Sequence, residues 1–303
     1  MPNSLPHVVG LGQCSWDILG HIEQFPAVDA KTELLDVVEQ GGGPVATALV
    51  ALARLGCHAT MLGTIGNDPY GESITQGLEA ESVDCKLLQK DPRGKSQCAF
   101  IAVEADTGRR NIFWTRGEKR PFVLGAEEKA TISHADFLHL DGLDEAASYQ
   151  AATCARERGV PTMLDGGTCR DGTMRLLPLI DHLVVSEKFA RQFCDGDNPE
   201  AALEQLSSFG ASSVTVTCGA DGSWTRGGNG TTFFQPAFSV KAIDTTGCGD
   251  VFHGGYLFGL LHNWSLKKTV RFSAACAALK TRAMGGRTAI PVIGEVEDFL
   301  KRN

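Results

Sequence analysis

From residue 135 onward the chain alternates short apolar segments with longer helical ones, and this pattern most constrains its fold. The residues predict strands at 135–142, 161–165, 183–186 and 213–217, with helices at 145–158 and 199–209. Such alternation is typical of a mostly parallel sheet covered by helices on both faces. Ligands of these sheets bind beyond the carboxyl ends of the strands. The predicted ends carry polar or glycine residues: Asp141-Gly142, Asp165-Gly166-Gly167, Ser186-Glu187 and Thr217-Cys218-Gly219.

A glycine-rich turn near the C-terminal end joins an extended segment to a predicted apolar helix at 251–261. Gly247 and Gly249 would let a phosphate approach the backbone closely, and the helix N-terminus supplies unpaired N–H groups and a favourable dipole. Asp250 at the rim suits a general base that takes a proton from an attacking hydroxyl. The plainer alternative is that Asp244 and Asp250 only cap the helix.

The full string D-T-T-G-C-G-D-V-F-H-G-G resembles the signature D-T-x-G-A-G-D-x-F-x-x-G of the ribokinase-like (PfkB) sugar kinases, with Cys248 in place of alanine. The resemblance implies an α/β fold, a doubly wound, mostly parallel sheet with a small β-sheet lid. It also implies phosphoryl transfer from ATP, with Mg²⁺, to a sugar hydroxyl. Asp250 would be the base, and the N–H groups of Gly247, Cys248 and Gly249 would stabilise the transferred phosphoryl group.

The N-terminal part offers candidate sugar-binding residues. Asp17 follows the predicted strand at 5–12, where the family places an aspartate that binds sugar hydroxyls; a turn aspartate is the alternative. Gly42, Gly43 and the segment Ala53-Arg54-Leu55-Gly56 match the family's first signature. Thr47 stands where that signature has asparagine, so it loses the paired donor and acceptor of an amide.

Two segments, about 14–42 and 96–116, are predicted to form the lid of a single kinase domain spanning residues 1–303. Asp106-Thr107-Gly108 is a hairpin signal inside the second segment. In the family such a lid covers the sugar and often mediates dimerisation, so we expect a homodimer. Five basic residues cluster in and after the hairpin, which indicates either a solvated face or contact with an anion: Arg109, Arg110, Arg116, Lys119 and Arg120.

The nucleotide site is predicted from a second resemblance, between residues 214–222 and the family's V-T-x-G-x-x-G loop. It implies contacts to ATP from Thr217, Gly219 and Gly222. Ser186 keeps a polar group where the family often has N-x-x-E, whereas Phe189 cannot replace the glutamate, so Mg²⁺ would be held mostly through water and phosphate oxygens.

Two further sites are implied by the family resemblance alone. Ser273 and Cys276, on a predicted helix at 266–284, fall where the family lines its adenine pocket. In relatives, the turn at Asp244 and the loop after that helix bind a monovalent cation. The resemblance therefore implies a K⁺ ion at Asp244.

Composition excludes several classes of protein. The net charge of −8 argues against a nucleic-acid surface, and no apolar run is long enough to span a bilayer. The N-terminus lacks the pattern of a signal peptide. The 10 cysteines form no Cys-x-x-Cys pair, which favours buried thiols in a reducing cytoplasm over disulfides or zinc.

We therefore predict an ATP-dependent carbohydrate kinase acting on a hydroxyl, expected to be primary, of a ketohexose or pentose. Parts of the sequence look most similar to the sulfofructose kinase branch, but Gly142 at a strand end and Trp114 in the hairpin favour a neutral sugar. A nucleoside kinase and a catalytically silent sugar-binding relative are the alternatives. The intact Asp250 turn argues against a catalytically silent relative, whereas Thr47 and Phe189 favour one.

Overall fold

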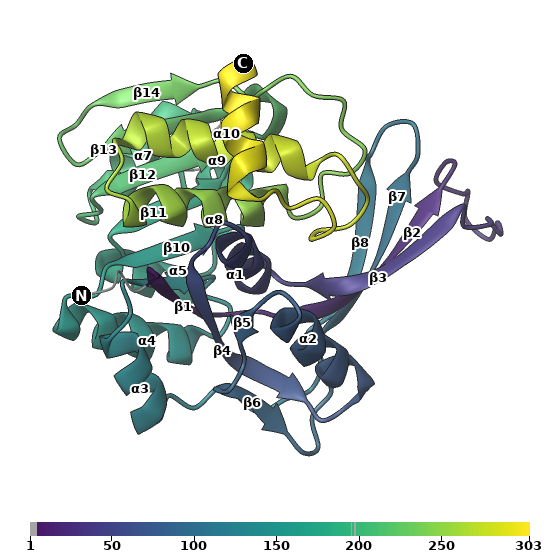
Figure 1. Ribbon diagram of the computed structural model, residues 1–303, viewed down its shortest axis with the longest axis horizontal. Coiled ribbons are helices and arrows are strands. Elements are labelled where there is room, and N and C mark those ends of the chain that lie inside the picture. The colour runs from purple at the N-terminus through teal and green to yellow at the C-terminus, as the bar shows by residue number, and fades with distance from the viewer. Residues whose placement is uncertain (1–4, 195, 197) are drawn as a thin grey trace.

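The computed structural model describes residues 5–194, 196 and 198–303, and its centre is a large sheet (Figure 1). The strand order is β14-β13-β12-β11-β10-β9-β1-β4-β5, with β6 paired to β4. All pairings are parallel except those of β13 and β14 at one edge. The strands are β1 His7–Leu11, β4 His58–Gly66, β5 Val83–Asp84, β6 Leu88–Asp91, β9 Phe137–Leu140, β10 Thr162–Gly166, β11 His182–Ser186, β12 Ser213–Thr217, β13 Ser223–Gly227 and β14 Thr232–Gln235.

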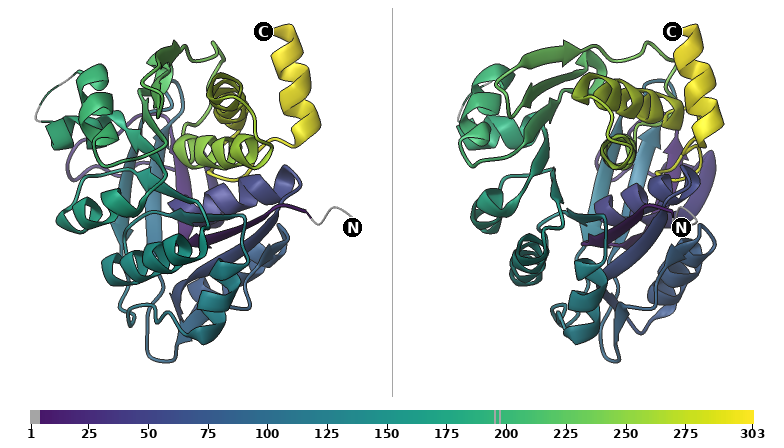
Figure 2. Two further views of the ribbon diagram at one scale, coloured as in Figure 1. Left: turned by 90° about the vertical axis from the view of Figure 1, so that its left-hand side faces the viewer. Right: turned by 60° about the vertical axis from the view of Figure 1, so that its left-hand side comes forward.

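Helices cover both faces of this sheet, as Figure 2 shows. The core on one face includes side chains of α1 Pro44–Arg54, α2 Pro69–Glu79, α8 Cys248–Leu261, α9 Leu266–Lys280 and α10 Ile293–Arg302. The core on the other includes side chains of α3 Ala126–Ser133, α4 Glu145–Arg158, α5 Asp171–Leu176, α6 Glu187–Cys194 and α7 Pro199–Ser207. Two short 3₁₀ helices, η1 Leu177–Leu179 and η2 Gly219–Asp221, complete the body. The predicted doubly wound α/β fold is confirmed.

Local chemistry sets the ends of the helices. Pro44 starts α1 directly after Gly43, and the Asp144 side chain caps α4, which ends at Gly159 in the left-handed conformation. Two predicted helix boundaries were wrong. The helix expected at 266–284 ends at Lys280, because the chain turns there toward Gly285, and α8 begins at Cys248 rather than at residue 251.

A separate four-stranded sheet, here called the lid sheet, projects from the body on the right of Figure 1. Its order is β3-β2-β7-β8, with β2 Ser15–Ile22, β3 Asp36–Gly42, β7 Cys98–Glu104 and β8 Arg110–Thr115. The predicted hairpin is confirmed as the antiparallel β7–β8 pair. A small core of its own contains Leu19, Ile101 and Val103. Within the described residues, no helix is both long and apolar enough to cross a membrane.

Candidate active site

Carboxylates gather where β9 and β10 end, at the edge of the sheet that faces α8. Asp141 follows β9, and its Oδ2 accepts a hydrogen bond from the Gln13 N–H at 2.6 Å. Gly12 makes this approach possible, because an added Cβ would lie 2.4 Å from the same oxygen. Asp165 lies on β10 beside Asp141, and that neighbouring charge adds to burial in raising the pKa of Asp165. The edge therefore concentrates negative charge with little solvent.

The glycine-rich turn forms the N-terminus of α8 above this edge. Gly247 is the N-cap residue with φ +74°, and a Cβ there would lie 2.9 Å from Gly286. Gly249 faces open space, since an added Cβ would meet no atom within 4 Å. The first-turn N–H groups of a 14-residue helix therefore point to a free surface, which suits an anion.

The Cys248 side chain turns away from that surface. Its thiol donates to the Ala277 carbonyl at 3.5 Å, and burial raises its pKa to about 11. The thiol is therefore neutral and packs between helices, and the Cys248 backbone N–H donates to the Thr245 carbonyl at 3.3 Å, so the open part of the turn is at Gly249.

Asp250 lies in the first turn of α8, and its environment suits a base that works near neutral pH. Burial raises its pKa, and the negative charge of Asp165 raises it further. Burial lowers the pKa of His253 one turn later, so its imidazole is neutral. His253 Nε2 lies 3.1 Å from the Val184 carbonyl and must donate to it, which leaves Nδ1 as an acceptor 3.3 Å from Asp165 Oδ2. Because each charge disfavours the other, the two carboxylates share one proton near neutral pH: Asp165, beside Nδ1, holds it, and Asp250 holds the charge.

Asp17 joins the lid sheet to the site. Its Oδ1 accepts from Ser15 Oγ at 2.7 Å, and burial raises its pKa. Gly42 lies against it, since a Cβ there would be 1.9 Å from Asp17 Oδ2. Gly43 has φ +95°, with no room for a Cβ beside the Gln13 carbonyl. These glycines bring the backbone close to Asp17.

Arg287 is the cation nearest this group. It is buried, and its Nη2 donates to the Gly42 carbonyl at 2.9 Å. Its positive charge opposes the effect of burial on the pKa of both Asp17 and Asp250. Thr47, predicted to bind sugar, is only 1% exposed inside α1, where the helix packs into the core.

Asp244, predicted to help bind a monovalent cation, already has a cation. Lys280 Nζ donates to the Asp244 carbonyl at 2.9 Å and lies 3.9 Å from its Oδ2, and both side chains are 0% exposed. The Asp244 carboxylate also accepts from Thr246 and from the Gly285 N–H at 2.7 Å. These residues do not fit a second cation, so the ammonium group corrects the K⁺ prediction at this position.

The predicted nucleotide residues lie on adjacent strands. Ser186 at the end of β11 pairs in register with Thr217 at the end of β12. Ser186 Oγ accepts from the Phe189 N–H at 3.1 Å and so also starts α6. Gly219, with φ +59°, has open space where a Cβ would be. Gly222 has φ +118° and abuts the Gln235 carbonyl. The structure thus brings these four predicted residues together at the edge of the sheet where β11 and β12 end.

Ser273 and Cys276 require a correction. Both are buried in the α8–α9 contact, where a Cβ on Gly255 would lie 3.0 Å from the Ser273 backbone and 3.2 Å from Cys276 Sγ. Ser273 Oγ bonds within its own helix to the Thr269 carbonyl. Neither side chain offers a surface to an adenine ring, because α9 turns this face toward α8.

Comparison with known proteins agrees with this geometry. A family model described as pfkB family carbohydrate kinase matches residues 6–293. The chain belongs to the pfkB family of carbohydrate kinases. Similar curated proteins include a ribokinase of Schizosaccharomyces pombe, 29% identical over 86% of this chain and 87% of that protein. An ATP-dependent ribose-1-phosphate kinase of Halopiger xanaduensis is 26% identical over 97% of each chain.

Solved structures agree on the fold of this pfkB kinase. A putative ribokinase from Agrobacterium tumefaciens superposes with a TM-score of 0.91 and 26% identity, covering 99% of this chain and 98% of that one. An Arabidopsis thaliana ribokinase complexed with ribose and ATP has a TM-score of 0.86 at 23% identity, with 99% of each chain covered. The family prediction is therefore confirmed, and the sulfofructose branch finds no such support.

Sequence reasoning missed several residues of this kinase's site. Asp141 and Asp165 were noted as strand ends but given no role, although two aspartates at adjacent ends were a usable signal. His253 was likewise given no role, and it is buried against Asp165. Lys280 and Arg287 gave no signal, since each meets its partner through a long-range contact.

Proposed function

We propose that this kinase transfers the γ-phosphoryl group of ATP to a hydroxyl, expected to be primary, of a small sugar such as a ketohexose or pentose. The observation that carries the proposal is the position of Asp250. A carboxylate with a raised pKa stands in the first turn of α8, beside a glycine turn with room for a phosphate. A base poised near working pH and an anion site next to it are the two needs of phosphoryl transfer to an alcohol.

The sugar would bind between the body and the lid sheet. Asp17 and the backbone of Gly42 and Gly43 would position its hydroxyls, in agreement with their contacts around Asp17. Asp250 would take the proton of the attacking hydroxyl, while the first-turn N–H groups of α8 stabilise charge on the transferred group. A protonated Asp165, held by His253, would keep a second negative charge away from the reaction.

ATP would lie along the ends of β11 and β12. The position of the four predicted nucleotide residues supports this binding mode: Ser186, Thr217, Gly219 and Gly222. An open backbone turn there faces the same edge of the sheet as Asp250. The described residues contain no cluster of three or more histidine, cysteine, aspartate or glutamate side chains placed to hold a metal ion, so Mg²⁺ would accompany the nucleotide and be held mostly through water and phosphate oxygens. Bound Mg²⁺ supplies charge neutralisation on the phosphate oxygens.

ATP consumption against a panel of sugars, sugar derivatives and nucleosides tests the proposal, with Asp250→Asn as the control. Turnover on a sugar that is lost in the variant supports a sugar kinase. Turnover on nucleosides alone would move the chain to the nucleoside kinase alternative. Sugar binding by calorimetry without turnover would make it a silent binder.

Dimerisation and location form a separate part of the proposal. The lid sheet leaves Ile112 49%, Phe113 62% and Trp114 48% exposed on β8, an apolar strand that a second copy could cover. We expect Phe113→Glu to shift the mass measured by light scattering from dimer to monomer, and an unchanged mass would contradict the interface. All 10 cysteines are free, which suits a reducing cytoplasm.

A further inference from the structure

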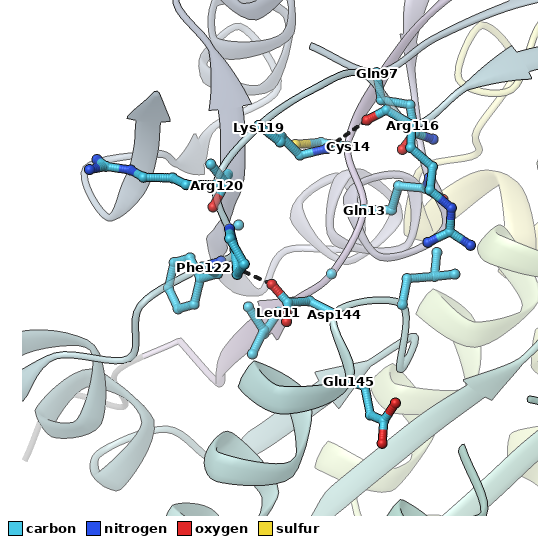
Figure 3. A pocket seen from close by; sticks show the side chains of 16 residues that line it. Leu11, Gln13, Cys14, Gln97, Arg116, Lys119, Arg120, Phe122, Asp144 and Glu145 are labelled. Carbon is cyan, nitrogen blue, oxygen red and sulfur yellow. Dashed lines mark hydrogen bonds between the residues drawn. The ribbon is translucent and has the colours of Figure 1, made fainter. Parts of the chain in front are cut away.

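A cavity of about 360 Å³ lies at the end of β1 and beside β4, with Gln13 and Cys14 in its wall (Figure 3). Leu11 and Gly12 end β1 at its floor, and Gly63 and Thr64 of β4 form another part of the wall. The segment after β8 closes the remaining side with cationic residues.

Three cationic residues line this cavity, Arg116, Lys119 and Arg120, and the first two face its interior. In Figure 3, Lys119 extends beside Cys14, and the Arg116 guanidinium hangs toward the space near Gln13. Lys119 Nζ donates to the Arg116 carbonyl at 3.0 Å, which ties the two residues together. Within residues 5–194, 196 and 198–303, neither side chain has a carboxylate within ion-pair distance. Two neighbouring cations without an acidic partner favour an anionic ligand.

The acidic residues of the lining are already engaged. Asp144 accepts from the Phe122 N–H at 2.9 Å and caps α4 through Ala147. Glu145 pairs with Arg175 at 3.3 Å. In Figure 3 Asp144 lies near the centre beside Phe122 and Glu145 lies below it, and both point away from Lys119 and Cys14 at the top. They leave the positive charge at the other end uncompensated.

The wall also has an unused polar group. Thr64 Oγ1 is buried without a hydrogen-bond partner among the described residues, and Gln97, which also lines the cavity, is 7% exposed. A small polar ligand can satisfy such a group, and an apolar one cannot.

The cavity adjoins the sugar side of the site. Its Gln13–Cys14 wall holds Asp141 through the Gln13 N–H, and the Cys14 thiol experiences the charges of both Lys119 and Arg287. The proposed nucleotide strands β11 and β12 lie on the other side of β10 in the strand order. Arg116 and Lys119 are therefore placed to meet the far end of the sugar rather than the ATP phosphates.

We infer that the sugar carries an anionic substituent, and that Arg116 and Lys119 bind it while Asp250 faces the hydroxyl at its other end. The inference rests on the proposed sugar kinase function and deepens it. The sequence favoured a neutral sugar because Trp114 could stack on a sugar face. In the structure Trp114 instead lies under the Arg116 guanidinium, 5.4 Å from its ring centroid, and is not part of the cavity wall.

A kinetic comparison tests the inference with matched acceptors that keep a free primary hydroxyl: fructose, fructose 6-phosphate, its 6-sulfonate analogue and a sugar acid. One anionic acceptor should exceed fructose at least about tenfold in kcat/KM, and its identity distinguishes phosphate, sulfonate and carboxylate. Arg116→Gln and Lys119→Gln should each raise KM for it roughly 10- to 100-fold with kcat little changed.

Arg120→Gln is the matched control. Arg120 has the same charge on the same segment and also lines the cavity, but its guanidinium turns outward in Figure 3 and donates to the Lys90 carbonyl at 3.2 Å. Its KM should stay within about twofold of wild type. A preference for fructose, or equal effects of all three variants, would overturn the anion site and leave the kinase intact. If no sugar turns over, calorimetric binding of the anionic acceptors still decides: loss in Arg116→Gln supports the site, and no binding to wild type overturns it.

Discussion

Asp244 and Asp250 stand six residues apart on either side of one glycine turn, and the structure gives them opposite environments. Asp244 is 0% exposed, carries Lys280 as its cation and accepts hydrogen bonds from Thr246 and Gly285. Asp250 lies in the first turn of α8 beside the acidic Asp165. The same residue type therefore has a structural role at one end of the turn and a chemical role at the other.

The comparison shows that charge balance, more than position, separates the two roles. The Asp244 carboxylate lies beside the Lys280 ammonium and accepts three hydrogen bonds, and these contacts hold it in place. A buried carboxylate beside another acid holds its proton more tightly and can exchange it near neutral pH. Substitutions on the Asp250 side of the turn should therefore lower the reaction rate, and substitutions on the Asp244 side should lower the stability of the protein.

The largest effect is expected from Asp250→Asn. Loss of the base should lower kcat on the order of 10²- to 10⁴-fold, because the amide cannot accept the proton. The free energy of unfolding should be unchanged or higher, since a buried charge is removed. Steady-state kinetics and urea unfolding measure both. A variant that retains wild-type kcat would show that Asp250 only caps the helix.

Lys280→Met should destabilise the protein by about 3–5 kcal/mol, because it leaves the Asp244 carboxylate buried without its cation. Thermal or urea unfolding measures the loss. Lys267→Met is the control, since Lys267 is exposed on the same helix. Equal stability of the two variants would contradict the structural role of the Lys280–Asp244 pair.

Because Lys280 already supplies a cation, wild-type activity should not change when K⁺ replaces Na⁺ at constant ionic strength. Initial rates in the two salts measure this. A strong requirement for K⁺ would show that the ammonium does not fill that place.

The raised pKa of Asp250 predicts an acid limb in the pH profile of kcat/KM. The base must be ionised, so activity should fall roughly tenfold for each pH unit below its pKa, and that pKa should lie above the ordinary aspartate value of 3.8. An acid limb near pH 4 would contradict the influence of burial and of Asp165.

Asp165→Asn should have a smaller effect than the other two substitutions, and in stability rather than rate. Burial raises the pKa of Asp165 above its unfolded value of 3.8, so the native protein binds this proton more tightly and loses stability as pH rises from there through the native pKa. The variant cannot ionise and keeps a donor for His253. Its unfolding free energy should exceed that of wild type above neutral pH by about 1 kcal/mol or more, with little difference near pH 4. An equal difference at both pH values would contradict this explanation.

The sequence by itself determined most of the architecture and the centre of the site. Apolar strands alternating with helices predicted the parallel sheet, and the turn around Asp250 predicted the helix N-terminus at its edge, because both depend on local patterns. The family resemblance added the lid sheet and the order of the motifs. These features are encoded by neighbouring residues.

Only the tertiary structure decided which polar groups meet. Lys280 reaches Asp244 across 36 residues, and Arg287 reaches Gly42 across 245, so no local pattern indicates either contact. The face that α9 turns toward α8 removed Ser273 and Cys276 from the site, and the fold of the segment after β8 placed Arg116 and Lys119 at the cavity. Helical spacing fixes which residues share a face, but packing decides what that face contacts.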